Sequence, residues 1–192
     1  MYTCRMNFPD DEPLWVDEKR LLLLAPPTVV RKQLTQSGSL TKTITQSCDQ
    51  RFKVAVIQQQ FATVELSERH RLHLSTTATA NIRTVLLHCG NQPWVFARTT
   101  IPHYALRRSL RRLIQLGNRS LGAVLHRSRA MERSNVEYAC FTQQHTLFQQ
   151  ATRHLKQPPE MLWGRRILYR IDGDPLLVNE LFLPCFPFGT TR

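Results

Sequence analysis

Two charged residues, Arg83 and Glu180, lie in stretches that otherwise alternate like half-buried β-strands. Side chains alternate between the two faces of a strand, so Arg83 shares a face with Val85 and Leu87. Glu180 shares its face with apolar residues in the same way: Leu176, Val178 and Phe182. A charge on an apolar face is costly unless it is paired or binds something. The pattern therefore indicates either a structural ion pair or a binding site.

An arginine on a mostly apolar sheet face is suited to bind a ligand carboxylate, because its planar guanidinium donates two parallel hydrogen bonds. A carboxylate in the same pocket could act as a general acid or base, or hold a ligand hydroxyl. Two plainer interpretations fit the same pattern: a structural Arg–Glu pair, or a strand whose opposite face is the core. A third charge, Arg98, shares a face with Trp94 and Phe96 and is interpreted as structural.

Other residue types that could do chemistry are less well placed. The five cysteines are widely spaced and form no Cys-x-x-Cys motif: Cys4, Cys48, Cys89, Cys140 and Cys185. Their odd number and spacing favour reduced thiols in a cytosol, with Cys89 and Cys140 in the core. His70 and His73 have no third ligand nearby, so no metal site is expected. No Ser or Cys lies in a nucleophile motif.

Two hairpins should position Arg83 and Glu180. The first joins 82–89 to 94–101 through a Gly-Asn-Gln-Pro turn, and the second joins 167–171 to 176–183 through Asp172-Gly173. Helices are expected at 13–24, at 40–48 with Ser39 as N-cap, and at 104–116. The remaining expectations are a strand at 52–58 paired with 61–66, an exposed loop at 68–78, a short buried segment at 121–126, a strand at 136–140 and a weakly helical stretch at 142–157.

Strands joined by hairpins, with helices in blocks between them, indicate an α+β fold with an antiparallel sheet. A chain of 192 residues is expected to form one domain, with loose termini at 1–12 and 188–192. The longest apolar run, 21–30, is split by two prolines and is far shorter than the ~20 residues of a membrane helix. Acidic residues precede this run, which argues against a signal peptide, so a cytoplasmic location is expected.

The formal net charge of +12 is concentrated in one region. Nine Arg and one acid, Glu132, lie between Arg98 and Arg133. Such a field attracts nucleic acid, anionic lipid or a small multivalent acid, and charge alone does not choose among them. The cluster at 107–112 has only Tyr104 as a nearby aromatic, so nucleic-acid binding is not expected.

Four separated motifs resemble the chorismate pyruvate-lyase family. They are Ser39-Leu40-Thr41-Lys42, the segment 82–102 with Arg83 and Arg98-Thr99, Leu116-Gly117 with Ser120-Leu121-Gly122, and Trp163-Gly164-Arg165-Arg166 followed by the segment 173–184 with Glu180. They occur in order and span most of residues 13–187. The resemblance implies an α+β domain with a sheet of about six antiparallel strands. It also implies a monomer whose ligand lies beneath flap-like segments.

The activity that the resemblance implies is a cofactor-free elimination, in which chorismate yields 4-hydroxybenzoate and pyruvate for quinone biosynthesis. Arg83 matches the residue that binds the ring carboxylate, and Glu180 matches the acid at the far end of the ligand. Leu40 and Leu121 match positions that contact the ligand through the backbone, although position 40 is Met in the best-known member. The stretch 142–160 is longer, and the cluster at 107–112 more basic, than the family pattern.

Two other classes of function remain open. The same sheet serves as a ligand-sensing module in some transcription regulators, so a non-catalytic module that binds aromatic acids is the alternative. Those regulators carry an N-terminal helix-turn-helix, whereas about 12 residues precede the first expected helix. A basic nucleic-acid-binding protein is the third hypothesis, and loss of salt-dependent retention on changing the cluster at 107–112 would support it.

Overall fold

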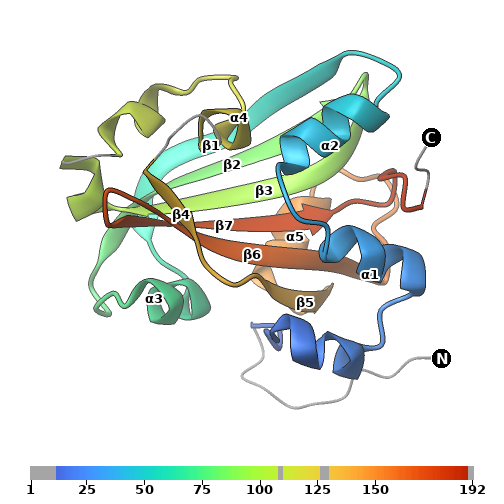
Figure 1. Cartoon of the computed structure of the whole chain (residues 1–192), viewed down its shortest axis with the longest axis horizontal. Helices are drawn as coiled ribbons and strands as arrows, with labels where there is room; N and C mark the ends of the chain where they lie inside the picture. Colours follow the sequence, from blue (N-terminus) through green and yellow to red (C-terminus); the bar gives the residue numbers. More distant parts are fainter. Residues whose placement is uncertain (1–11, 108–109, 126–129, 190–192) are drawn as a thin grey trace.

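The computed structural model describes residues 12–107, 110–125 and 130–189. Their strands form one antiparallel sheet in the order β1-β2-β3-β7-β6-β4, and β5 also pairs with β6 (Figure 1). The strands are β1 (Phe52–Thr63), β2 (Thr79–Cys89), β3 (Gln92–Pro102), β4 (Met131–Arg133), β5 (Glu137–Thr142), β6 (Met161–Ile171) and β7 (Asp174–Phe182). The α+β class is confirmed. The sheet has seven strands, where the resemblance implied about six, and the additional short strand is the three-residue β4.

Both expected hairpins are present. β2 and β3 pair from Ala80 opposite Pro102 to Cys89 opposite Gln92, and β6 and β7 pair around the Asp172-Gly173 turn. Asp172 and Gly173 both have positive φ, which is the conformation that this type of turn requires. Because the two hairpins meet where β3 pairs with β7, the strands that carry Arg83 and Glu180 are separated by β3 alone.

Helices cover both faces of the sheet. The first face is covered by α1 (Thr28–Leu34), α2 (Leu40–Ser47) and α4 (Leu121–Leu125), whose buried residues cluster with residues such as Val85, Leu87 and Val178. The opposite face is covered by α3 (Leu66–Leu72) and α5 (Thr146–Thr152), which cluster with Leu86, Leu177 and their neighbours. The expected α2 helix is confirmed, including its N-cap, because the Ser39 side chain accepts a hydrogen bond from the Lys42 amide.

Three expectations about where helices form were wrong in detail. The stretch at 68–78 is not all loop, because α3 buries Glu68 and Leu72 on one side, four residues apart. The stretch at 104–116 forms short 3₁₀ turns, η2 (His103–Arg107) and η3 (Arg111–Gln115), with residues 108–109 undescribed. The buried leucines there recur every three residues, at 110, 113 and 116, which is the 3₁₀ period rather than the α period. The helix expected at 13–24 is a 3₁₀ turn, η1 (Glu18–Leu24), and α1 follows it unpredicted.

One strand assignment was also wrong. The segments 52–58 and 61–66 do not pair with each other, because β1 runs unbroken to Thr63 and pairs with β2 along its length. A register shift between Val56 and Gln58 disturbs the alternation, which made the two halves look like separate strands. The short buried segment at 121–126 corresponds to α4, and the strand at 136–140 to β5. Within the longer stretch 142–160, α5 packs three apolar residues on the core: Leu147, Phe148 and Ala151.

The expectation for the cysteines was wrong. Cys48 and Cys89 form a disulfide, while Cys140 and Cys185 are not disulfide-bonded. Cys48 and Cys89 are 41 residues apart in the sequence, and only the packing of α2 against the end of β2 brings them together. The burial of Cys89 and Cys140 was predicted correctly. Cys4 and most of the expected loose termini lie outside the described residues. No helix in the described ranges is long and apolar enough to cross a membrane.

Candidate functional site

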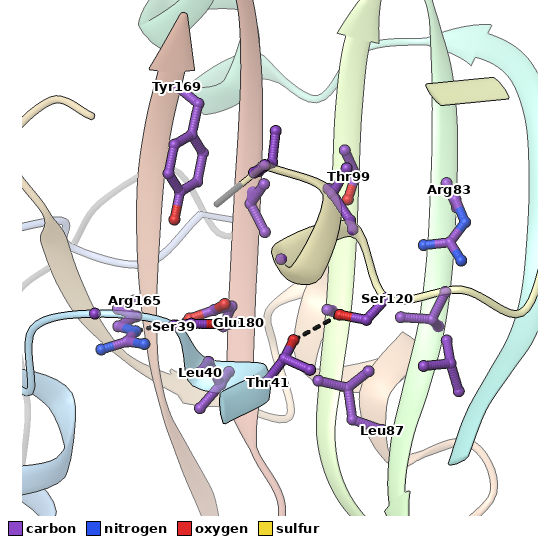
Figure 2. Close-up of a pocket in the computed structure, with 18 residues that line it drawn as sticks. Ser39, Leu40, Thr41, Arg83, Leu87, Thr99, Ser120, Arg165, Tyr169 and Glu180 are labelled. Atoms are coloured by element: carbon purple, nitrogen blue, oxygen red, sulfur yellow. Dashed lines mark hydrogen bonds and ion pairs between the residues drawn. The ribbon is translucent and has the colours of Figure 1, made fainter. Parts of the chain in front are cut away.

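A cavity of about 50 Å³ lies between the first face of the sheet and helices α2 and α4 (Figure 2). About 10–15 Å³ suffices for one water molecule, so the cavity has room for several waters. Its walls are largely apolar and include Val54, Val85, Leu87, Leu125 and Val178. The four residues singled out in the sequence, Leu40, Arg83, Leu121 and Glu180, all line it. The fold therefore brings the predicted site residues together in one enclosed space.

Arg83 lies on β2 and forms a cationic side of this cavity. It is 3% exposed, and its Nη2 donates hydrogen bonds to the carbonyls of Gly117 at 2.8 Å and Arg119 at 3.3 Å. Its Nε is buried without a hydrogen-bond partner, and no described carboxylate lies within ion-pair distance. Burial lowers the pKa of Arg83, but an arginine starts so high that it stays charged at neutral pH. A buried charge without a counter-ion favours an anionic ligand.

Glu180 lies on β7 and forms an ion pair with Arg165, which is directly opposite on β6. The Arg165 Nε is 2.7 Å from the Glu180 Oε2. Arg165 is itself held from the other side, because its Nη1 donates to the carbonyls of Leu34 and Gln36, both at 3.0 Å. Glu180 therefore does form a structural ion pair with an arginine, which was one of the two plainer interpretations of the sequence. Its partner is Arg165 and not Arg83. Arg83 is left available for a ligand.

Arg165 and Tyr169 line the cavity as well, and neither was identified as a site residue from the sequence. Arg165 could have been found by counting the register of the second hairpin. The turn places Ile171 opposite Asp174, so the residue opposite Glu180 is Arg165. Tyr169 shares the same face of β6, and burial together with the charge of Glu180 raises the pKa of its hydroxyl to about 12. The alternation of Ile167, Tyr169 and Ile171 gave no sign that the middle residue reaches a cavity.

Helices α2 and α4 close the cavity and are joined by one side-chain hydrogen bond. Thr41 Oγ1 on α2 lies 2.6 Å from Ser120 Oγ, the residue before α4 (Figure 2). Leu40 and Leu121, the first residues of the two helices, are both buried against the cavity. Their predicted backbone contacts with a ligand stay predictions. The close approach depends on Gly122, where a Cβ atom would lie 2.8 Å from Thr41 Oγ1.

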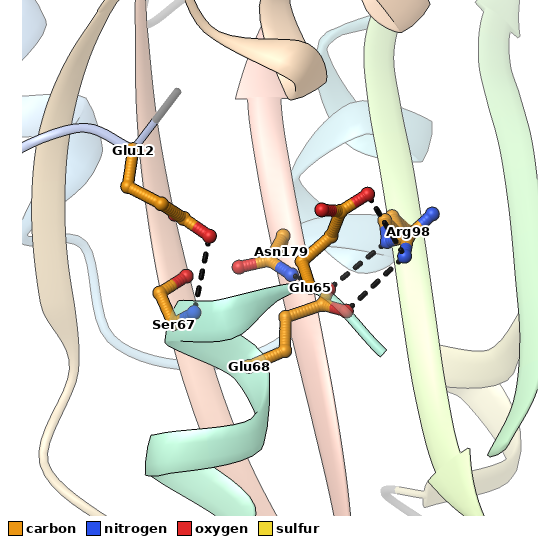
Figure 3. A network of polar contacts seen from close by, with 6 residues as sticks. All are labelled: Glu12, Glu65, Ser67, Glu68, Arg98 and Asn179. Carbon is orange, nitrogen blue, oxygen red and sulfur yellow. Dashed lines mark hydrogen bonds and ion pairs between the residues drawn. The ribbon is translucent and has the colours of Figure 1, made fainter. Parts of the chain in front are cut away.

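Arg98 lies on the opposite face of the sheet, in a separate buried network (Figure 3). Its Nε and Nη2 donate to the two carboxylate oxygens of Glu68 on α3, at 3.0 and 3.2 Å. Asn179 on β7 donates to the same carboxylate at 2.7 Å. The interpretation of Arg98 as structural agrees with these contacts. Phe96 does share its face, but Trp94 clusters with Leu87 on the first face, because Trp94 is the extra residue of a β-bulge.

The described residues contain one group of potential metal ligands, and it does not surround the cavity. Cys48, Asp49 and Cys89 have ligand atoms within 4.8 Å of one another, but the two thiols are joined in the disulfide. His70 and His73 belong to no such group among the described residues. The cavity itself offers two guanidiniums, the Glu180 carboxylate, a phenol and several hydroxyl groups among its apolar walls.

An antiparallel α+β sheet with a buried guanidinium in a largely apolar cavity is suited to bind a small anion with an apolar body. Comparison with known proteins identifies the family. The profile described as "Chorismate lyase" matches residues 11–188. A "Probable chorismate pyruvate-lyase" of Nitrosospira multiformis is 39% identical over 154 residues, covering 80% of this chain and 86% of that protein. One of Shewanella amazonensis is 34% identical over 185 residues, covering 96% and 95%. The chain belongs to the chorismate lyase family, which confirms the resemblance seen in its motifs.

Solved structures support the fold alone. PhnF of Mycobacterium smegmatis superposes with a TM-score of 0.54 at 10% identity, covering 96% of this chain and 93% of PhnF. The effector domain of PhnF gives a TM-score of 0.51 at 10% identity, covering 82% and 96%. The sheet is thus shared with ligand-sensing modules of regulators, while the sequence relationship is with lyases.

Proposed function

We propose that this chain is a chorismate pyruvate-lyase that converts chorismate to 4-hydroxybenzoate and pyruvate without a cofactor. The proposal rests on one observation. Arg83, which has no carboxylate partner among the described residues, and Glu180, which Arg165 holds in place, line the same largely apolar cavity. The two residues lie on strands two positions apart, roughly 10 Å at the usual strand spacing. The register offsets them by two residues along the sheet, and both line the same cavity.

The ring carboxylate would bind Arg83, and the hydroxyl and ether carbons would face Glu180. In the reaction, the bond between the ring and the ether oxygen breaks, and the oxygen keeps the electron pair. The neighbouring ring carbon loses a proton, and its electron pair completes the aromatic ring. The departing enolpyruvate then takes up a proton to become pyruvate. Because aromatisation supplies much of the driving force, the protein's task is to orient the substrate and to stabilise developing charge.

The ion pair with Arg165 has a consequence for the role of Glu180. A carboxylate bound through Oε2 at 2.7 Å keeps its orientation, and its Oε1 makes no hydrogen bond to the described residues. Glu180 is therefore suited to accept a hydrogen bond or a proton from the hydroxyl end of the substrate. The net charge of +12 would also raise the local concentration of a dianion such as chorismate.

Purified protein is expected to release pyruvate and 4-hydroxybenzoate in equal amounts from chorismate, with no added metal or nucleotide. Product absorbance and a coupled assay for pyruvate measure the two products separately. A chelator-treated sample serves as control and should retain full activity. A pure, folded sample that yields neither product would refute the proposal.

The fold of the effector modules favours a second candidate, a non-catalytic domain that binds aromatic acids. Titration with 4-hydroxybenzoate separates the candidates, since binding without turnover of chorismate would favour the module. For the lyase, we further propose that the product feeds quinone biosynthesis and that the protein acts as a cytoplasmic monomer. Neither a nucleic-acid partner nor a cofactor belongs to this proposal. Gel filtration of the purified protein tests the monomer directly.

Gly122→Ala is expected to open the cover of the cavity. The new Cβ would lie 2.8 Å from Thr41 Oγ1, so the Thr41 hydroxyl must turn away or α2 must shift, and in either case its hydrogen bond with Ser120 is lost. Loss of one such bond should speed the dissociation of 4-hydroxybenzoate by roughly 3- to 10-fold. Stopped-flow displacement measures this rate. Thr45→Ala, which removes an exposed hydroxyl elsewhere on α2, is the control and should leave the rate unchanged. An unchanged rate in Gly122→Ala would show that the two helices do not limit release.

A further inference from the structure

Tyr169 places a third polar group in the cavity, beside Arg83 and the Glu180 ion pair. It lies on β6, four residues beyond Arg165 and on the same face. Its ring clusters with apolar residues of α4 and β7, Leu121, Leu125 and Val178 among them. Its hydroxyl points along the cavity toward the Arg165–Glu180 end (Figure 2). The phenol thus reaches the part of the cavity where the ligand's hydroxyl end would lie.

The hydrogen-bond partners at this end are incomplete. Within the described part of the chain, no hydrogen bond uses the Tyr169 hydroxyl, and Glu180 bonds Arg165 through Oε2 alone. At this end of the cavity the Glu180 Oε1 and the Tyr169 hydroxyl therefore have no hydrogen-bond partner among the described residues, whereas the Ser39 hydroxyl already accepts from the Lys42 amide. Neither atom is among the fully buried side-chain atoms that lack a partner, so both reach solvent in the cavity. A ligand that displaces this water has to replace its hydrogen bonds. A ligand group that both donates and accepts would satisfy the two together.

Glu180 and Tyr169 differ in protonation, so that one can accept and the other can donate a hydrogen bond to the same ligand hydroxyl. An ionised carboxylate only accepts hydrogen bonds, whereas a protonated phenol can donate one. Burial and the nearby charge of Glu180 raise the pKa of Tyr169 to about 12, so its hydroxyl carries its proton at neutral pH. A ligand hydroxyl can donate to the carboxylate while it accepts from the phenol. A hydrogen or a methyl group at the same place could do neither.

We propose that Tyr169 is a specificity-determining residue, which donates a hydrogen bond to the ligand hydroxyl oxygen whose proton Glu180 accepts. The cavity would then select ring acids that carry a hydroxyl opposite the carboxylate held by Arg83. This inference rests on the proposed function for the identity of the ligand. It goes further by assigning the recognition of the hydroxyl to two side chains instead of one.

Calorimetric titration of wild type and Tyr169→Phe with 4-hydroxybenzoate and with benzoate tests the proposal. Removing one donor should weaken 4-hydroxybenzoate binding by roughly 3- to 10-fold. Benzoate, which lacks the hydroxyl, should bind both proteins alike and reports that the cavity of the variant is intact. Tyr138→Phe is the matched control, because Tyr138 is also buried but does not line the cavity. It should bind both ligands as wild type does.

Equal losses for the two ligands, or no loss for either, would overturn the role of Tyr169. A chorismate assay on the same samples separates this outcome from failure of the lyase proposal. Turnover by wild type, with no selective loss in Tyr169→Phe, would overturn the tyrosine assignment alone. A selective loss without any turnover would support the tyrosine assignment and refute the lyase.

Discussion

Arg83→Met should reduce kcat/KM for chorismate by roughly 30- to 5,000-fold, which corresponds to a loss of about 2–5 kcal/mol when a buried charge pair loses one partner. The loss is expected because the Arg83 guanidinium is buried without a counter-ion. Among the described residues it donates to two backbone carbonyls and to no carboxylate. A bound carboxylate would be its counter-ion. Steady-state kinetics with chorismate measure the loss. Arg111→Met, which removes an exposed charge outside the cavity, should leave kcat/KM nearly unchanged.

The same variant should keep or gain stability without ligand. Desolvation lowers the pKa of Arg83, which means that the folded state holds the charged form less well than the unfolded state does. At neutral pH that penalty is present in full, and methionine of similar length removes it. Thermal unfolding without ligand is therefore expected at the same or a higher temperature. Wild-type kinetics in Arg83→Met, or collapse of its fold, would each contradict the assignment of Arg83 as a ligand-binding residue.

Glu68→Ala should destabilise the fold by about 3–5 kcal/mol, the usual cost of breaking a buried ion pair by removing one partner. The Glu65 carboxylate, 3.9 Å from Arg98, would remain as a more distant and more exposed partner. Arg98 would lose both of its hydrogen bonds to the carboxylate, and Asn179 would lose a third. For a domain of this size the midpoint of thermal unfolding should fall by roughly 6–20 °C. Denaturant titration and thermal scans measure the change. Glu160→Ala removes an exposed carboxylate and should shift the midpoint little.

A double variant, Glu68→Leu with Arg98→Met, makes this prediction sharper. Replacing a buried ion pair by apolar residues is often neutral, so most of the lost stability should return. The kcat/KM of folded protein should stay close to wild type in both variants, because the network lies on the face away from the cavity. A loss below about 1 kcal/mol in Glu68→Ala would show that the pair is solvated rather than buried.

Strand alternation predicted the two faces of the sheet well. It placed Arg83 and Glu180 on the same face as apolar residues, and the cavity is lined accordingly. Alternation alone did not separate Arg98 from these two, because all three charges share a face with apolar residues. The error at Trp94 came from a bulge, since one extra residue reverses the face of everything beyond it. A bulge leaves little trace in a single sequence, because each half of the strand still alternates.

The partners of the charges were less predictable. Arg165 lies opposite Glu180 by the register of a tight turn, so local information was sufficient to find it. Glu68 lies 30 residues before Arg98, on a helix that a polar and threonine-rich stretch concealed. The disulfide between Cys48 and Cys89 depends on how a helix packs on the sheet. Such contacts follow from tertiary packing, which spacing along the chain does not encode.

The disulfide between Cys48 and Cys89 restricts the conformations of the unfolded chain. It closes a loop between residues 41 apart, which removes about 4 kcal/mol of conformational entropy from the unfolded ensemble by the usual loop-closure relation. That difference is a large fraction of the net stability of an ordinary domain. The protein would therefore be more stable with the disulfide formed than with both thiols reduced. The ratio of oxidised to reduced glutathione around it would decide which form is present. Because Cys48 directly follows α2, the dithiol form would also free one end of a helix that covers the cavity.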